Sequence, residues 1–299
     1  MRYIFGPVYS RRFGISLGID LSPDKKRCNF DCLYCELDRS KPVDSYDNPP
    51  DPGEIFRELK GFLEKNPEPD VITITSNGEP TLYPYLDSLI TMVNSIKNSS
   101  KTLILSNGST IYKEEIQKTL KKFDIVKISL DAVSQQIFKK IDRPHSGISL
   151  EKILEGLKSF REDFKGKLII EILVVKYVND KEEYIKEIGE VLKDIKPDRV
   201  DIGTVDRPPA YRVFPVSNEK LYYLASLLKG FNVNVVERRY EKTFEYDISR
   251  EDIIKTLSKR PLTKEDVENT FSLETKKRLQ QLLEEGKVKH KNGFFLITD

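Results

Sequence analysis

The chain has 299 residues, of which 38% are hydrophobic, and 50 basic against 48 acidic side chains leave a net charge of +2. This size suits one large domain with a small second one, and the charge balance excludes a global basic field for nucleic acid while leaving a local patch open. The N-terminal stretch MRYIFGPVYSRRFG lacks the apolar core of a secretory signal, and no apolar run could cross a bilayer. We therefore expect a cytoplasmic protein without a membrane partner. An odd number of cysteines, three, argues against a disulfide framework.

Short β-branched runs alternate with helix-length segments over most of the chain. Strands are predicted at residues 15–21, 70–75, 102–106, 125–130, 168–175 and 199–205, with 232–237 as a final candidate. Helices are predicted near residues 52–66, 85–96, 113–122, 153–160, 182–195 and 221–228, where apolar residues recur at helical spacing. About six βα units indicate a parallel sheet but are fewer than the eight of a closed barrel. The prediction is an α/β fold in which residues 1–237 form a partial (β/α)6 barrel.

The C-terminal part follows a different pattern. Residues 238–248 are polar and aperiodic and are predicted to be a linker, and residues 249–299 a separate domain. Ser249 caps a first helix, Pro-Leu-Thr opens a second, and a third runs from Ser272 to a stop signal at Gly286. An Asn-Gly turn then joins two short strands as a hairpin. Three helices and a hairpin in this order predict a small winged helix-turn-helix domain.

The sequence has three cysteines, Cys28, Cys32 and Cys35. All lie in one stretch of eight residues in the loop that follows the first predicted strand. Buried structural cysteines would be scattered, and the flanking residues here are polar. A structural zinc site needs four ligands, and both histidines, His145 and His290, are distant in sequence. A thioredoxin-like pair would use only the last two cysteines and leave Cys28 unexplained. The spacing favours a [4Fe–4S] cluster on three thiolates, whose fourth iron has no protein ligand and can bind a substrate.

Cys-x3-Cys-x2-Cys with an aromatic residue before the last cysteine resembles the radical S-adenosylmethionine superfamily. The sequence NGEP after the second predicted strand is similar to the superfamily's Gly-Gly-Glu-Pro segment, although ordinary turns share this composition. The resemblance covers about residues 15–236. It implies a [4Fe–4S] cluster on the three cysteines and S-adenosylmethionine bordered by Tyr34, Asn77, Gly78, Glu79 and Pro80, with the Glu79 carboxylate near the amino group.

Short polar residues at other strand ends could reach the same nucleoside. By position, the resemblance places near its ribose, carboxylate or adenine the residues Ser106, Asn107, Ser129, Asp131, Ile202 and Gly203. Hydroxyl, amide and carboxylate groups suit such hydrogen bonds, and they suit helix capping equally well. Nearby loops hold Arg11, Arg12 and Arg207, which are either anion-binding or ordinary surface arginines. His145 is either a proton donor or a structural loop residue.

The resemblance implies an enzyme that takes one electron from a reductant such as a flavodoxin or ferredoxin. It would cleave S-adenosylmethionine to methionine and a 5′-deoxyadenosyl radical, which abstracts hydrogen from a substrate. The segments GPVYSRRFG, LGIDL and DRPP resemble the wyosine-synthase-related branch, whose members modify a tRNA base. Wyosine synthases carry further cysteines for a second cluster, which this sequence lacks, so wyosine formation itself is not expected.

Three hypotheses for function remain at this stage. The first is a radical enzyme acting on a tRNA or other RNA base, with Lys276, Lys277 and Arg278 of the third C-terminal helix contacting phosphates. The second is a radical enzyme acting on a peptide, protein or small molecule, with the winged helix docking a partner. The third is an iron–sulfur DNA-binding sensor without turnover, against which the βα pattern argues because a sensor does not need a barrel.

Overall fold

The computed structural model describes residues 2–10, 12–236 and 246–298. Arg11 and most of the predicted linker 238–248 lie outside the described residues, so the domain boundaries remain a prediction. Within the described ranges the main sheet holds eight strands in chain order, of which β1 is antiparallel to β2 and the others are parallel. The strands are β1 (Ile4–Ser10), β2 (Gly14–Asp20), β3 (Val71–Thr75), β4 (Lys101–Ser106), β5 (Ile125–Ser129), β6 (Lys167–Val174), β7 (Arg199–Thr204) and β8 (Val233–Val235).

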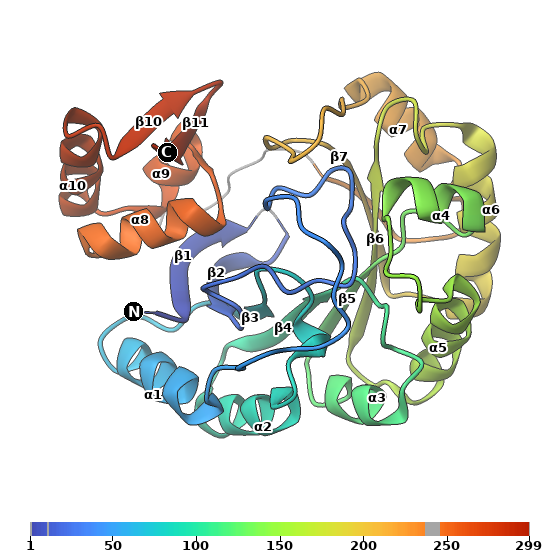
Figure 1. Cartoon of the computed structure of the whole chain (residues 1–299), viewed down its shortest axis with the longest axis horizontal. Coiled ribbons are helices and arrows are strands. Elements are labelled where there is room, and N and C mark those ends of the chain that lie inside the picture. Colours follow the sequence, from blue (N-terminus) through green and yellow to red (C-terminus); the bar gives the residue numbers. More distant parts are fainter. Residues whose placement is uncertain (1, 11, 237–245, 299) are drawn as a thin grey trace.

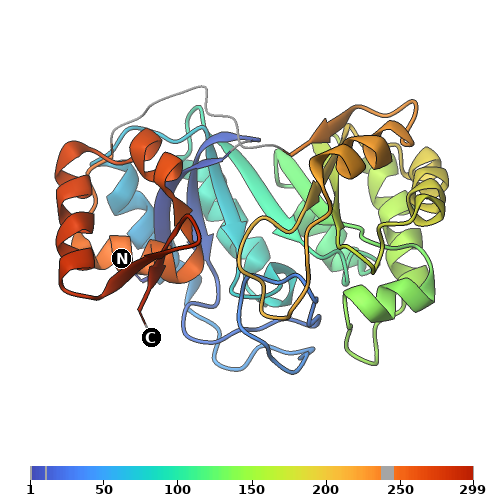
Figure 2. The same cartoon turned by 90° about the horizontal axis from the view of Figure 1, so that it is seen from above.

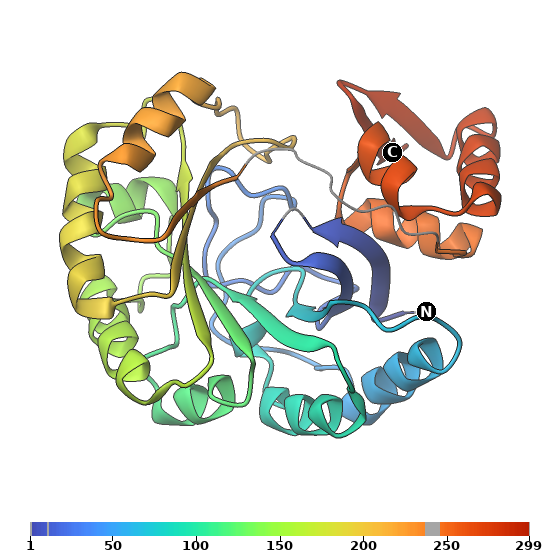
Figure 3. The ribbon, with the colours of Figure 1, turned by 180° about the vertical axis from the view of Figure 1, so that it is seen from behind.

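Helices cover the convex face of this curved sheet (Figures 1 and 3). They are α1 (Pro52–Leu63), the 3₁₀ helix η1 (Pro80–Leu82), α2 (Leu86–Ile96), α3 (Glu114–Leu120), α4 (Gln135–Ile141), α5 (Leu150–Asp163), α6 (Glu182–Ile195) and α7 (Asn218–Ser226). Each strand from β2 to β7 is followed by at least one of them, as the predicted βα units require. No helix in the described part of the chain combines the length and apolar character needed to cross a bilayer.

The periodic apolar residues form the core between sheet and helices. In α6, Ile185, Ile188, Leu192 and Ile195 are all fully buried, which is the stripe that their helical spacing predicts. The parallel strands are buried on both faces and are correspondingly rich in β-branched residues. The loops at the carboxyl ends of these strands are then free to carry polar and sulfur-containing residues.

Strand β1 is an addition that the sequence pattern did not predict. Its Gly6-Pro7 pair interrupts the alternation of a strand, and the pairing with β2 shifts register between Phe5 and Val8. Proline is tolerated here because β1 is the edge strand of the sheet. The outer edge is covered by the C-terminal part of the chain, since the Gly6 amide donates to Thr256 Oγ1 at 3.2 Å.

Residues 246–298, the C-terminal module, lie beside β1 at one end of the sheet (Figures 1 and 2). The module contains α8 (Arg250–Lys259), β9 (Leu262–Thr263), α9 (Lys264–Thr270), α10 (Leu273–Glu284), β10 (Val288–Lys291) and β11 (Phe294–Ile297). The side chains of Ser249, Thr263 and Ser272 cap the three helices, and the small antiparallel sheet has the order β10-β11-β9. The predicted helices and hairpin are therefore confirmed as elements. The module's apolar core also includes Val8 of β1.

Candidate active site

The loop after β2 brings all three cysteines to one cavity of about 850 Å³. Donors point at two of the sulfur atoms: the Phe30 amide lies 3.4 Å from Cys28 Sγ and Lys26 Nζ 3.5 Å from Cys35 Sγ. Such donors stabilise thiolates and tune the clusters that thiolates bind. Burial raises the pKa of Cys28 to about 12 and that of Cys32 well above its ordinary value, and a bound metal cation would offset this cost of the thiolate form.

The donor set fits an iron–sulfur cluster. The three cysteines line the same cavity, and Cys32 is close enough to the other two for their charges to raise its pKa. In the described residues, no three His, Cys, Asp or Glu side chains converge as the ligands of a single ion would. A cubane does not require that convergence, because each thiolate binds a different iron.

The loop after β3 is joined to the cysteine loop by backbone hydrogen bonds. The Arg27 amide donates to Asn77 O and the Glu79 amide donates to Arg27 O, both at 2.8 Å. This contact requires glycine between the two, because Gly78 has φ +138° and an added Cβ would lie 1.8 Å from Arg27 O. The pairing leaves the predicted cofactor segment and Cys28 as neighbours on the cavity wall.

The carboxylate of Glu79 organises two loops. It is 1% exposed, and its Oε1 accepts from Thr81 N at 2.9 Å, Thr81 Oγ1 at 2.6 Å and Ser106 Oγ at 2.7 Å. Its Oε2 accepts from Asn107 N at 2.7 Å. Burial raises the pKa of Glu79, and these donors oppose that rise. The residues predicted to contact the cofactor after β3 and β4 therefore meet in one hydrogen-bonded group.

The other predicted site residues divide into two sets. Those that line the cavity are Tyr34, Asn77, Gly78, Glu79, Ser106, Asn107, Ser129 and Gly203, together with the three cysteines. Pro80, Asp131 and Ile202 are buried and are not among the residues that line it. Asp131 accepts hydrogen bonds from Tyr34 Oη and, at 2.7 Å, from Leu173 N. Binding roles for all of these residues remain predictions.

Three charged residues in the barrel interior, Lys127, Glu171 and Asp201, were not predicted from the sequence. Lys127 is 2% exposed, and its Nζ lies 2.7 Å from Glu171 Oε1 and 3.5 Å from Asp201 Oδ2. Arg12 also pairs with Glu171. Burial and the Arg12 charge lower the pKa of Lys127 to about 8, whereas Arg12 and Lys127 overcome the effect of burial and lower the pKa of Glu171 to about 2. The available signal was one charged residue in the interior of each of three otherwise apolar strands.

The C-terminal module supplies part of the cavity wall. Lys259, the last residue of α8, and Arg260 after it both line the cavity, as do Arg12 and Arg207 of the barrel loops. Arg207 pairs with Glu36 of the cysteine loop at 3.0 Å. The proximity of the module to the sulfur atoms was not predicted, because a linker gives no indication of where the following domain docks.

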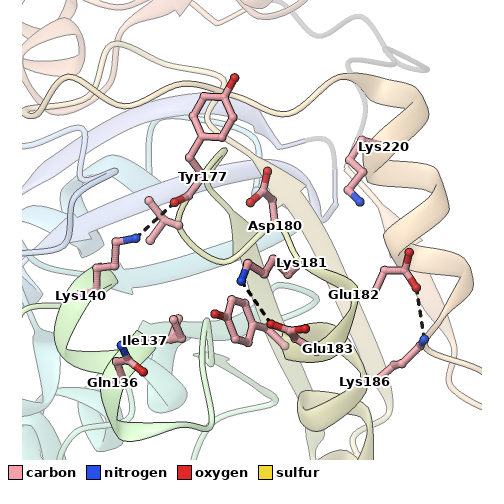
Figure 4. Close-up of a pocket in the computed structure, with 12 residues that line it drawn as sticks. Gln136, Ile137, Lys140, Tyr177, Asp180, Lys181, Glu182, Glu183, Lys186 and Lys220 are labelled. Atoms are coloured by element: carbon pink, nitrogen blue, oxygen red, sulfur yellow. Dashed lines mark hydrogen bonds and ion pairs between the residues drawn. The ribbon is translucent and has the colours of Figure 1, made fainter.

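A second hollow, of about 900 Å³, lies outside the barrel between α4, α6 and α7 (Figure 4). Two ion pairs lie in its wall, Lys181 with Glu183 at 3.4 Å and Lys186 with Glu182 at 3.2 Å. Lys140 donates to the carbonyl of Tyr177 at 3.2 Å. It holds none of the thiols, so we place the candidate active site in the other cavity.

An open, curved α/β sheet with a sulfur-lined cavity at its carboxyl edge defines a class of cofactor-dependent enzymes. The family model for the radical SAM superfamily matches residues 24–202, and the chain belongs to this superfamily. A UPF0026 protein of Helicobacter pylori (strain J99) is 40% identical over 282 residues, covering 94% of this chain and 91% of that protein. UPF0026 protein MJ1312 of Methanocaldococcus jannaschii is 30% identical over 284 residues, covering 91% and 87%.

Solved structures support the fold independently. The structure of TYW1 with a lysine–pyruvate adduct bound superposes with a TM-score of 0.52 at 20% identity, covering 76% of each chain. At this identity the similarity concerns the fold alone. Membership of the superfamily makes the protein an enzyme, and the superfamily's chemistry implies S-adenosylmethionine and a [4Fe–4S] cluster as cofactors.

Proposed function

We propose that the chain is a radical enzyme that binds a [4Fe–4S] cluster through Cys28, Cys32 and Cys35 and cleaves S-adenosylmethionine reductively. The observation that carries this proposal is that the three thiols and the Glu79 carboxylate line one cavity. When bound, the two cofactors supply an electron and a 5′-deoxyadenosyl radical that abstracts hydrogen from the substrate. A flavodoxin or ferredoxin is the class of reductant that such an enzyme requires.

The residues of the chain would bind and orient the cofactor. The Glu79 carboxylate, held in place by Ser106 and Asn107, would accept a hydrogen bond from the amino group of S-adenosylmethionine. Gly78 would allow the cofactor to approach the backbone closely. The rest of the cavity, with Arg12, Lys127 and Glu171, is the space for a substrate.

We further propose that the C-terminal module is a winged helix and that it does not bind nucleic acid. Its element order and three-stranded sheet support the first part. The cations of α10 support the second, because each faces a carboxylate of its own chain: Lys276 with Glu268 at 3.0 Å and Lys277 with Glu274 at 2.7 Å. Arg278 pairs with Asp247.

This arrangement favours a peptide, protein or small molecule as substrate over an RNA base. Copurifying RNA, or RNA binding that weakens steeply with salt and depends on α10, would contradict this preference.

Anaerobic reconstitution tests the enzyme assignment. The reconstituted chain should show the Mössbauer spectrum of a [4Fe–4S] cluster and, with S-adenosylmethionine and dithionite, should release 5′-deoxyadenosine. Cys32→Ala should lose both cluster and product. A wild-type chain that binds zinc or no iron under oxygen-free conditions, or product that persists in Cys32→Ala, would refute the assignment.

A further inference from the structure

The last residue of α8 reaches from the C-terminal module to the start of the cysteine loop. Lys259 Nζ lies 2.7 Å from Asp20 Oδ2 and donates to Pro23 O at 2.9 Å. Asp20 is the last residue of β2 and is 1% exposed. A buried carboxylate in such a position requires a counter-charge or several donors, and here the counter-charge comes from a different part of the fold.

The same carboxylate fixes the loop after β3. Asp20 Oδ1 accepts from Ser22 N at 2.9 Å and from Asn77 N at 2.8 Å. The carbonyl oxygen of Asn77 in turn accepts a hydrogen bond from the amide of Arg27, the residue before the first cysteine. A continuous path of ionic and hydrogen bonds therefore links Lys259 to the segment that begins at Asn77 and to Cys28.

We propose that Lys259 is a positioning residue for the S-adenosylmethionine-binding segment, so that the C-terminal module forms part of the cofactor site. Without its counter-charge, the buried Asp20 carboxylate moves toward water. This movement weakens its hydrogen bond to the Asn77 amide, and the segment that carries Gly78 and Glu79 loses an anchor. The part of this inference that concerns S-adenosylmethionine rests on the proposed function.

A matched control lies one helical turn earlier in α8. Lys255 Nζ donates to Ile4 O at 2.9 Å and lies 4.0 Å from Glu58 Oε1. It therefore also fastens the module to the barrel, but at the outer edge of β1. A Lys255→Met variant loses docking contacts of the same kind but keeps the direct contact between Lys259 and Asp20, because Lys255 acts on Asp20 only as a more distant charge.

The experiment compares Lys259→Met and Lys255→Met with wild type as full-length, reconstituted chains. Hydrogen exchange followed by mass spectrometry should show faster exchange over residues 76–80 in Lys259→Met only. Isothermal titration should show that the affinity of Lys259→Met for S-adenosylmethionine falls about tenfold, a change in the range usual for coupled sites. Lys255→Met should keep the wild-type affinity. Iron content and thermal unfolding are measured alongside to confirm that both variants are folded.

The outcomes separate the two proposals. Equal exchange over residues 76–80 in both variants, or equal affinity in two folded variants, would overturn the role of Lys259 and reduce it to a docking contact. A wild-type chain that neither binds nor cleaves S-adenosylmethionine would overturn the proposed function instead. The exchange difference can be measured without the cofactor, so it decides whether Lys259 positions the segment even in that case.

Discussion

The phenol of Tyr34 donates a hydrogen bond to the buried carboxylate of Asp131 and so joins the cysteine loop to the end of β5. Asp131 is 2% exposed, and its other oxygen accepts from Leu173 N at 2.7 Å. Burial raises the pKa of Asp131 to about 7, while these two donors oppose the rise. The sequence predicted both residues as independent cofactor contacts, whereas the structure pairs them with each other.

Removing the phenol oxygen should destabilise the chain. Tyr34→Phe leaves a buried carboxylate oxygen without its donor, which costs about 1–3 kcal/mol of unfolding free energy. Urea unfolding of the full-length chain, kept free of iron by a chelator so that cluster loss does not contribute, measures this change.

Tyr211→Phe is the matched control for Tyr34→Phe. Tyr211 Oη donates to Asp31 Oδ2 at 2.6 Å, but the Tyr211 side chain is partly exposed and the same Asp31 oxygen keeps Arg143 Nη2 at 3.3 Å when the phenol is removed. Tyr211→Phe should therefore cost less than Tyr34→Phe. Equal losses would show that burial of the Tyr34 pair does not set its contribution.

The parallel sheet could be predicted because its signals are local. Apolar periodicity and strand length depend on neighbouring residues, and the caps at Ser249 and Ser272 were equally readable. Strand β1 could not be predicted, because its Gly6-Pro7 interruption is acceptable only at an edge that α8 covers. The pairing of an edge depends on contacts between residues far apart in sequence.

The candidate site shows the same limit. The spacing of the cysteines and the NGEP sequence were visible as short motifs, and the cavity brings them together. The partners of Glu79 come from another loop, and Lys259 comes from another module, so their roles depend on tertiary structure. Lys127 could be recognised in the sequence as a charged residue inside an apolar strand, and this pattern indicates a buried ionic group.

Gly78 should not tolerate a side chain. Gly78→Ala places a methyl group 1.8 Å from Arg27 O at a positive φ, so the two loops must separate. We expect a loss of about 2–4 kcal/mol of unfolding free energy, together with loss of 5′-deoxyadenosine formation. Thermal unfolding and a single-turnover assay measure the two effects.

Gly61→Ala provides the opposite case within the same chain. Gly61 lies inside α1, and an added Cβ there meets nothing within 4 Å. Alanine should raise stability by about 0.5–1 kcal/mol because it lowers the entropy of the unfolded chain and favours the helix. If Gly78→Ala proved as stable as Gly61→Ala, the close contact between the two loops would be incorrect.

Glu68 should make stability depend on pH in the acid range. Its carboxylate accepts from the amides of Asn98 at 2.7 Å and Ser99 at 3.0 Å. Burial is the largest single influence and raises the pKa of Glu68, but these amides, with the Ser99 hydroxyl and the Ser100 amide, together outweigh it and lower the pKa from 4.5 to about 2. The unfolded chain therefore binds the proton more readily. The stabilisation is complete above pH 4.5 and is lost as the pH falls toward 2.

Glu68→Gln should consequently be less stable than wild type at pH 7, by about 1 kcal/mol for such exposed hydrogen bonds. The difference in unfolding free energy between wild type and variant should narrow as the pH is lowered below about 4.5. Protonation of Glu68 then removes from wild type the stabilisation that the variant lacks at every pH. Urea unfolding at several pH values measures both curves. Glu64→Gln, which removes an exposed carboxylate 4.0 Å from Lys60, serves as control and should track wild type. A gap for Glu68→Gln that stays constant down to pH 3 would contradict the assignment of the acid-range loss to this carboxylate.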